Sequence, residues 1–365
     1  MLMNMKTVIH GGNTLSAALK AKIAPTSLLD FSANINPLGV PSELKKVLTA
    51  ALDEINVYPD PEYRLLKQSL AQHFQITDKS VFVGNGATQL IFQIACSLRQ
   101  KVALVLAPTF GEYERALQQA QFQVEHYYLE AKNNFTLNMD DFIYFLKATP
   151  QIKVICLANP NNPTGCVLAF ADLQKLVAFC NQTQRYLILD EAFIALTWPT
   201  AQSYVNQLTS NDNVYLIHSA TKFFAIPGLR LGYCFVKKPQ LQTLLRQYSE
   251  PWSVNILAAR FGAAMFQAQQ YIAETQHWLQ TELGWMFQQL SHIRDLTVFP
   301  SRTNFFLLKT KHLDLQTALL THRLLIRQCS DYEGLDEHYF RIAVRSHQDN
   351  QRLIKYLQLL MTKEG

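Results

Sequence analysis

Short apolar runs alternate with segments of helical periodicity between residues 88 and 218. The apolar runs predict buried strands, and the segments with an apolar residue every third or fourth position predict amphipathic helices. The strands are expected at 101–107, 152–158, 186–190 and 213–218, and the helices at 88–98, 111–121, 138–148 and 169–183. Strands and helices that alternate in this way are typical of a mostly parallel sheet covered by helices.

The pattern changes near residue 250. A helical, aromatic-rich stretch runs to about residue 291, as in a connecting helix. A strand at 303–309, a helix at 314–322, two further short strands and a helix at 348–361 then predict a smaller α+β unit. We therefore expect three parts: an N-terminal segment (1–40) that joins the small domain, a large domain (41–250), and a connecting helix with the small C-terminal domain (251–365).

The composition narrows the class of protein. A chain of 365 residues with 48% hydrophobic and 17% charged residues is typical of a soluble globular protein with a large core. The net charge of +5 is not clustered, which argues against nucleic-acid binding and favours small anionic ligands. No membrane-spanning run, secretion signal or metal site is predicted. The six cysteines form no CxxC pair, so we expect free thiols in the cytoplasm.

Lys222 stands out in the stretch SATKFFAIPGLRLG, three residues after Ser219 and eight before Arg230. This spacing suits a Schiff-base lysine beside a phosphate site, because the amine must reach an aldehyde while hydroxyls and a guanidinium hold a phosphate. Pyridoxal phosphate (PLP) carries both groups on one small ring. Lys222 is therefore the expected catalytic lysine, with Ser219, Thr221 and Arg230 as phosphate ligands.

Three upstream features fit the same cofactor. Asp190 ends the run YLILD, where a carboxylate keeps a pyridine nitrogen protonated, although such an Asp also serves as a helix cap. Asn162, in NPNNPTG, suits an amide donor to the ring 3′-oxygen and also a turn built from Asn and Pro. The turn GNGAT precedes an apolar helix whose free amides favour a phosphate, with Gly86, Ala87 and Thr88 as the expected contacts.

The order Asn, Asp, Lys, Arg in these motifs resembles the class I/II aminotransferase family of fold type I PLP enzymes. The resemblance implies an α/β fold with a large domain, built on a mostly parallel seven-stranded sheet, and a smaller α+β domain. It also implies that Phe110, in PTFGEY, stacks on the cofactor. Phe193 departs from the family pattern, since many relatives carry a tyrosine whose hydroxyl reaches the ring 3′-oxygen. Ala87 is a second departure, at a position that is often acidic.

A second anion-binding site is indicated outside the PLP motifs. Arg341 alone suggests a site for an α-carboxylate. Arg327 and the turn HGGN, which begins at His10, suggest a substrate with two anionic ends, because a planar guanidinium matches carboxylate and phosphate oxygens. A surface salt bridge for Arg327 and a turn or helix-entry role for His10 are the alternatives.

Within the family, the chain resembles the L-threonine-O-3-phosphate decarboxylases nearly end to end. The resemblance is carried by HGGN, DFSANINPLG, YPDP, DEAF, TKFFAIPGLRLGY, PWSVN and IR…YEGLD…FRIAVRS. It implies loss of CO2 from phosphothreonine to give (R)-1-aminopropan-2-yl phosphate for the cobalamin nucleotide loop. It also implies a homodimer in which Tyr58 reaches the PLP phosphate of the neighbouring subunit. The implied substrate contacts are His10, Gly11, Asn34, Asn162, Arg327 and Arg341.

Two alternative functions stay open, and a third is argued against. A histidinol-phosphate aminotransferase shares the architecture and a phosphorylated substrate, but Phe193, HGGN and the YEGLD segment argue against it. A phosphoserine decarboxylase differs by one methyl group in the substrate, which a pocket discriminates weakly. A PLP-binding regulator normally carries a DNA-binding domain, and the cofactor domain begins too early in this chain to leave room for one.

Overall fold

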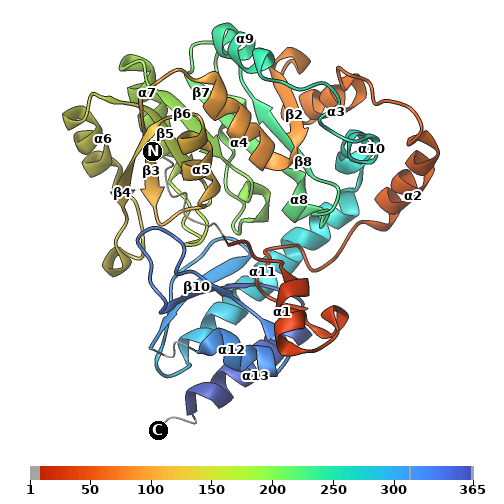
Figure 1. The fold of residues 1–365 in the computed structure, drawn as a ribbon, viewed down its shortest axis with the longest axis vertical. Coiled ribbons are helices and arrows are strands. Elements are labelled where there is room, and N and C mark those ends of the chain that lie inside the picture. The colour runs from red at the N-terminus through yellow and green to blue at the C-terminus, as the bar shows by residue number, and fades with distance from the viewer. Residues whose placement is uncertain (1–8, 312–313, 363–365) are drawn as a thin grey trace.

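A seven-stranded sheet forms the larger part of the molecule (Figure 1). The computed structural model describes residues 9–311 and 314–362, so residues 1–8 of the predicted N-terminal segment lie outside the described part. Within the described ranges the strand order is β2 (Val81–Asn85), β8 (Leu231–Phe235), β7 (Val214–Ser219), β6 (Tyr186–Asp190), β5 (Ile152–Ala158), β3 (Val102–Ala107) and β4 (Gln123–Tyr128). Only β8 runs antiparallel to its neighbours in this sheet, so the predicted mostly parallel seven-stranded sheet is confirmed.

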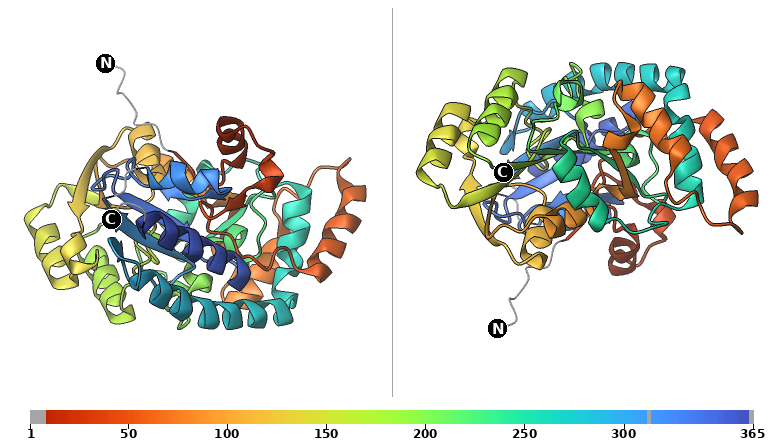
Figure 2. Two further views of the ribbon diagram at one scale, coloured as in Figure 1. Left: turned by 90° about the horizontal axis from the view of Figure 1, so that it is seen from below. Right: turned by 90° about the horizontal axis from the view of Figure 1, so that it is seen from above.

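Helices cover both faces of this sheet (Figure 2). Side chains of β5 alternate between the faces: Val154 and Cys156 enter one core, and Ile155 and Leu157 enter the other. The first core contains side chains of α4 (Gly86–Ser97), α5 (Glu112–Gln119) and α9 (Pro239–Gln247). The second contains side chains of α3 (Arg64–Phe74), α6 (Met139–Ala148), α7 (Phe170–Gln182) and α10 (Ile256–Ala264).

A smaller antiparallel sheet lies below the large one in Figure 1. Its strand order is β12 (Arg327–Gln328), β13 (Tyr339–Ala343), β10 (Phe305–Thr310) and β9 (Leu296–Val298). The long helix α11 (Gln269–Ser291) connects the two sheets, and α12 (Leu315–Thr321) and α13 (His347–Thr362) pack with the smaller one. The remaining helices are α1 (Thr14–Ala21), α2 (Ser42–Ala51) and α8 (Ala220–Phe223).

The N-terminal segment joins the C-terminal region through a short parallel pair. Strand β1 (Leu29–Asp30) pairs with β11 (Leu324–Leu325), and Phe31 accepts a backbone hydrogen bond from Ala343. This pairing supports the expected association of the N-terminal segment with the small α+β part. The exact division into 1–40, 41–250 and 251–365 stays a prediction.

The predicted elements match the observed ones, apart from the region between residues 250 and 343. Instead of one connecting helix, the chain forms α10 and α11, separated by a 3-10 turn at Met265–Gln267. The helical region begins only at Ile256, because the Asn255 side chain accepts a hydrogen bond from Ala258 N and caps α10. Further along, three short strands (β11, β12 and β13) take the place of the predicted two.

None of the described helices combines the length and apolarity needed to cross a membrane. Across residues 9–311 and 314–362, no group of three or more His, Cys, Asp or Glu side chains is arranged to hold a metal ion.

Candidate active site

A pocket of about 760 Å³ opens at the carboxyl ends of the parallel strands. Its floor includes Asp190 at the end of β6 and Lys222, just beyond β7. The opposite wall comes from residues 9–14 and 30–35 and from Tyr332 and Arg341 near the smaller sheet. Ligands collect at this edge of α/β sheets, because the strand ends bring side chains from distant parts of the chain together.

Asp190 is a buried carboxylate with two fixed hydrogen bonds. Its Oδ2 accepts from the Tyr113 hydroxyl at 2.8 Å, and its Oδ1 accepts from Ala192 N at 2.7 Å. Burial raises its pKa, while the Tyr113 hydrogen bond and the charge of Lys222 oppose that rise. The carboxylate is therefore held in one orientation at the floor of the pocket.

Lys222 lies beside this carboxylate with its amine near a hydroxyl. Its Nζ is 3.3 Å from Ser219 Oγ, and Ser219 also caps α8 by accepting from Thr221 N. Burial lowers the pKa of Lys222 to about 8; Asp190 opposes this effect, and Arg230 adds to it. A lysine with a lowered pKa has more neutral amine near pH 7 and is a better nucleophile toward an aldehyde.

The start of α4 and the side chain of Arg230 form a cradle suited to a phosphate. Gly86 has φ +79°, and a Cβ at this position would meet Arg230 Nη2 at 2.4 Å, so the guanidinium lies directly against the helix N-terminus. The buried Thr221 Oγ1 has no hydrogen-bond partner in the described part of the chain. Ala87 and Thr88 also line the pocket here. Free amides, a guanidinium and an unused hydroxyl are groups suited to binding a phosphate.

Aromatic rings border the cradle. Phe110 lines the pocket, and its ring centroid is 5.6 Å from that of Tyr113 and 5.9 Å from the His10 imidazole. Phe193 also lines the pocket, with its ring centroid 5.5 Å from Lys222 Nζ. Both rings are therefore close enough to border a planar cofactor above Asp190.

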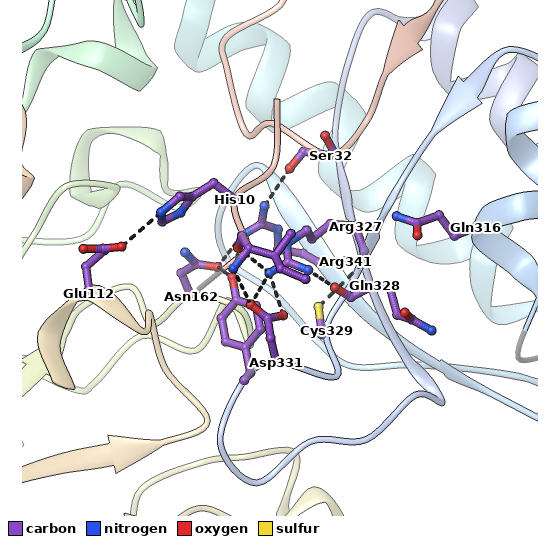
Figure 3. Close-up of polar contacts among 12 residues, drawn as sticks. His10, Ser32, Glu112, Asn162, Gln316, Arg327, Gln328, Cys329, Asp331 and Arg341 are labelled. Atoms are coloured by element: carbon purple, nitrogen blue, oxygen red, sulfur yellow. Dashed lines mark hydrogen bonds and ion pairs between the residues drawn. The ribbon is translucent and has the colours of Figure 1, made fainter. Parts of the chain in front are cut away.

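Arg341 is the cation at the other end of the pocket (Figure 3). Its Nη2 donates to Ser32 O at 2.6 Å, and its Nη1 donates to Asn162 Oδ1 at 2.5 Å. It forms no ion pair with a carboxylate within the described residues, so its charge is available to an anionic ligand. Asn34 lines the same region, and its buried Oδ1 has no partner there either.

Arg327 is near this end of the pocket but does not line it. Its Nη2 is 2.6 Å from Asp331 Oδ1 and donates to Ile9 O at 2.6 Å (Figure 3). The Arg327 side chain is buried and only 11% of the Asp331 side chain is exposed, so the alternative of a surface salt bridge does not describe this pair. In this arrangement Arg327 holds the backbone of the pocket wall, and both of its Nη atoms already bond to groups of its own chain.

The HGGN turn lies across the pocket mouth. His10 Nε2 is 3.0 Å from the buried Glu112 Oε1, and both residues line the pocket. Burial opposes ionisation of Glu112, but the hydrogen bonds from His10 and Arg115 hold its pKa below the ordinary value. A Cβ at Gly11 would lie 2.0 Å from Ser32 O, so only glycine lets the turn pack this closely.

Tyr58 lies outside the pocket of its own chain. Its side chain is 79% exposed, and its ring centroid is 4.7 Å from that of Trp252. The described chain thus brings the other predicted cofactor and substrate residues to or beside one pocket, while Tyr58 stays on the surface.

Four residues of the site were assigned no role from the sequence. Tyr113 bonds to Asp190, Glu112 to His10, Asp331 to Arg327, and Tyr332 to Asn162 and Arg341. Tyr113, Glu112 and Tyr332 lie inside motifs that are otherwise informative, but no spacing rule links them to partners on other elements. Their polar side chains next to motif residues were the only available signal.

The fold and the lysine–aspartate floor define a PLP enzyme of fold type I. The chain belongs to the family described as aminotransferase class I and II, whose model matches residues 26–357. This match confirms the family expected from the motifs.

The relatives include both activities considered from the sequence. The chain is 41% identical to the threonine-phosphate decarboxylase of Salmonella typhimurium over 97% of this chain and 96% of that protein. The crystal structure of L-threonine-O-3-phosphate decarboxylase from Porphyromonas gingivalis has a TM-score of 0.81 and 27% identity, covering 91% of this chain and 99% of that one. The crystal structure of histidinol-phosphate aminotransferase from Clostridium acetobutylicum has a TM-score of 0.85 and 28% identity. The match covers 92% of this chain and 99% of that one.

Proposed function

We propose that this protein is a PLP-dependent decarboxylase of L-threonine O-3-phosphate. The products are CO2 and (R)-1-aminopropan-2-yl phosphate, which serves assembly of the cobalamin nucleotide loop. The observation that carries the proposal is a single pocket with a cofactor floor at Lys222 and Asp190 and a separate anion-binding end at Arg341. The 41% identity to a threonine-phosphate decarboxylase over nearly the whole chain supports it.

The residues of the floor fit PLP. Gly86, Ala87, Thr88, Ser219, Thr221 and Arg230 are assigned to the phosphate and its surroundings, Phe110 to the ring face, Asn162 to the 3′-oxygen, Asp190 to the ring nitrogen and Lys222 to the aldehyde. When bound, PLP supplies a ring that accepts the electrons released when a bond to the substrate Cα breaks.

The protein selects which bond to Cα breaks by holding the two anionic ends of the substrate. Arg341 binds the carboxylate, and His10, Gly11 and Asn34 contact the phosphate, with Arg327 fixing the wall behind them. This two-point grip orients the carboxylate for loss of CO2, so remote binding energy selects the reaction. Lys222 Nζ then delivers a proton to Cα.

We also propose a cytoplasmic homodimer with shared active sites. The cysteines within the described ranges are free thiols, in keeping with a reducing compartment. The exposed large apolar side chains include a group between residues 52 and 65, which suits a buried interface. This group is Leu52, Ile55, Val57, Tyr58 and Leu65.

The reaction is tested by incubating the PLP-loaded protein with phosphothreonine while CO2 and the cofactor absorbance are followed. CO2 release with PLP regenerated is the expected result. Accumulation of pyridoxamine phosphate without CO2 would indicate transamination and favour a histidinol-phosphate aminotransferase. Phosphoserine, tested in parallel, measures how strongly the pocket requires the substrate methyl group.

A further inference from the structure

Tyr332 connects two residues that the proposed function assigns to different ligands. It lies between β12 and β13, lines the pocket and is buried. Its hydroxyl accepts from Arg341 Nη1 at 3.2 Å and lies 3.3 Å from Asn162 Oδ1, to which it donates. Arg341 Nη1 donates to the same Asn162 oxygen. The three side chains therefore form a closed triangle of hydrogen bonds.

The triangle determines which way the Asn162 amide faces. A carboxamide presents an oxygen and an NH2 group in opposite directions, and its hydrogen-bond partners decide the orientation. Two donors, the Arg341 guanidinium and the Tyr332 hydroxyl, meet at Asn162 Oδ1. The NH2 group is therefore turned away from them, where it is free to serve as a donor to a ligand.

The same triangle restrains Arg341. This guanidinium forms no ion pair with a carboxylate in the described chain, so neutral groups alone position it. Ser32 O holds Nη2, and the Tyr332 hydroxyl and Asn162 Oδ1 hold Nη1. Neutral partners fix the geometry of the fork and leave its positive charge uncompensated, which suits capture of a carboxylate.

The ring of Tyr332 has a separate contact. It faces Arg327, whose guanidinium carbon is 5.4 Å from the ring centroid. Removing only the hydroxyl therefore breaks the triangle but keeps the ring beside Arg327. It also preserves the packing of a small hydrophobic core formed by Phe135, Phe299, Leu307, Cys329, Tyr332 and Tyr339.

We propose that Tyr332 is a positioning residue for the carboxylate end of the substrate, since its hydroxyl fixes Arg341 and Asn162 relative to one another. This inference rests on the proposed function for the identity of the ligand. The inference predicts that loss of the hydroxyl weakens the binding of ligands that carry the carboxylate. The binding of ligands that lack the carboxylate should stay unchanged.

The test compares phosphothreonine with (R)-1-aminopropan-2-yl phosphate, which is the same molecule without the carboxylate. Binding of each to PLP-loaded wild type and Tyr332→Phe is measured from the change in cofactor absorbance, read by stopped flow before turnover. We expect about tenfold weaker binding of phosphothreonine to the variant, in line with a lost contact to a charged group. Binding of the carboxylate-free ligand should change by less than about twofold.

Tyr339→Phe is the matched control. Tyr339 is buried in the same small core as Tyr332, and within the described residues its hydroxyl makes no hydrogen bond. This variant should bind both ligands like wild type. The proposal would be overturned if Tyr332→Phe weakened the binding of both ligands equally, or weakened the binding of neither.

CO2 release separates this inference from the proposed function. A wild-type protein that binds phosphothreonine without releasing CO2 overturns the decarboxylase, while the ratio of the two affinities still decides the role of Tyr332. A wild-type protein that binds neither ligand overturns both.

Discussion

Lys222 and Asp190 influence each other's protonation at the floor of the pocket. Burial disfavours the charged form of both side chains, which lowers the pKa of Lys222 to about 8 and raises that of Asp190. Each charge partly stabilises the other. Part of the Lys222 amine is consequently neutral and available as a nucleophile near neutral pH. The fraction that stays protonated is the cation that stabilises the Asp190 carboxylate.

This coupling predicts the pH dependence of cofactor capture. Only the neutral amine attacks an aldehyde, so the rate of PLP uptake by the PLP-free protein should rise with pH and level off just above a midpoint of about 8. Asp190→Asn should move the midpoint lower, because the carboxylate favours the protonated lysine. Stopped-flow absorbance from pH 6 to 10 measures both midpoints. A wild-type midpoint near 10.5, the ordinary value for lysine, would contradict the prediction.

Arg327 and Asp331 form a pair that should be costly to break from one side. Arg327→Ala leaves the largely buried Asp331 carboxylate without its cation, and the expected loss in free energy of unfolding is about 3–5 kcal/mol. Binding of phosphothreonine should also weaken by roughly two- to tenfold, because the pocket wall loses the hydrogen bond from Arg327 to Ile9 O. Denaturant unfolding of Arg327→Ala, Asp331→Ala and the double variant measures the coupling. If the double variant were as unstable as the sum of both single ones, the two side chains would not act as a pair.

That the proposed cofactor residues lie together was predictable at the residue scale, because they are close in sequence. Ser219, Lys222 and Arg230 lie within one loop and helix, so spacing alone indicated a common site. The substrate end was harder to predict, since Arg327 binds Ile9 from 318 positions away and Arg341 binds Ser32 from 309. Only folding shows that Arg327 is tied to Asp331 and that Arg341 is left without a carboxylate.

At the scale of elements, the close approach of α4, β8 and Arg230 shapes the phosphate cradle. Besides the contact at Gly86, a Cβ on Gly232 of β8 would lie 2.3 Å from Ala87 N. Small residues on both elements therefore let the strand, the helix start and the guanidinium share one narrow space.

Gly86→Ala should damage this cradle. The positive φ costs an L-residue about 1 kcal/mol, and the new methyl group displaces Arg230, so we expect roughly tenfold weaker PLP binding. Gly284→Ala is the control: Gly284 is exposed in α11, and an added Cβ meets nothing within 4 Å. That substitution should stabilise the helix by up to about 1 kcal/mol. Titration with PLP and thermal unfolding measure both effects; wild-type PLP affinity in Gly86→Ala would refute this account.

The elements recovered best from the sequence were the fully buried ones. Strands β5, β6 and β7 are mostly apolar runs, which mark parallel strands covered on both faces. Strand β4 lies at the sheet edge, and its sequence QVEHYY is half exposed, so no such run marks it. The antiparallel direction of β8 follows from sheet topology and leaves no trace in the apolar pattern.

For the whole molecule, the exposed Tyr58 and its apolar surroundings make the oligomeric state decisive. If Tyr58 completes a neighbour's site, a mixture of Tyr58→Ala and Lys222→Ala proteins should regain activity that neither has alone. When the two variants exchange subunits at a one-to-one ratio, half of the dimers contain one subunit of each kind. Each of these dimers has one intact site out of two, so about a quarter of wild-type activity is expected. Sedimentation verifies the dimer. No recovery after verified subunit exchange would place Tyr58 outside the shared site.

The parallel pairing of β1 with β11 has a consequence for the time at which activity arises during synthesis. Residues 9–34 leave the ribosome early, yet they contact Arg327 and Arg341 only after nearly all of the chain has been translated. Domains generally fold as their sequence emerges, so the large sheet and its cofactor floor can assemble first. A nascent chain thus acquires a place for PLP before it acquires a place for substrate, and chemistry begins only when translation is almost finished.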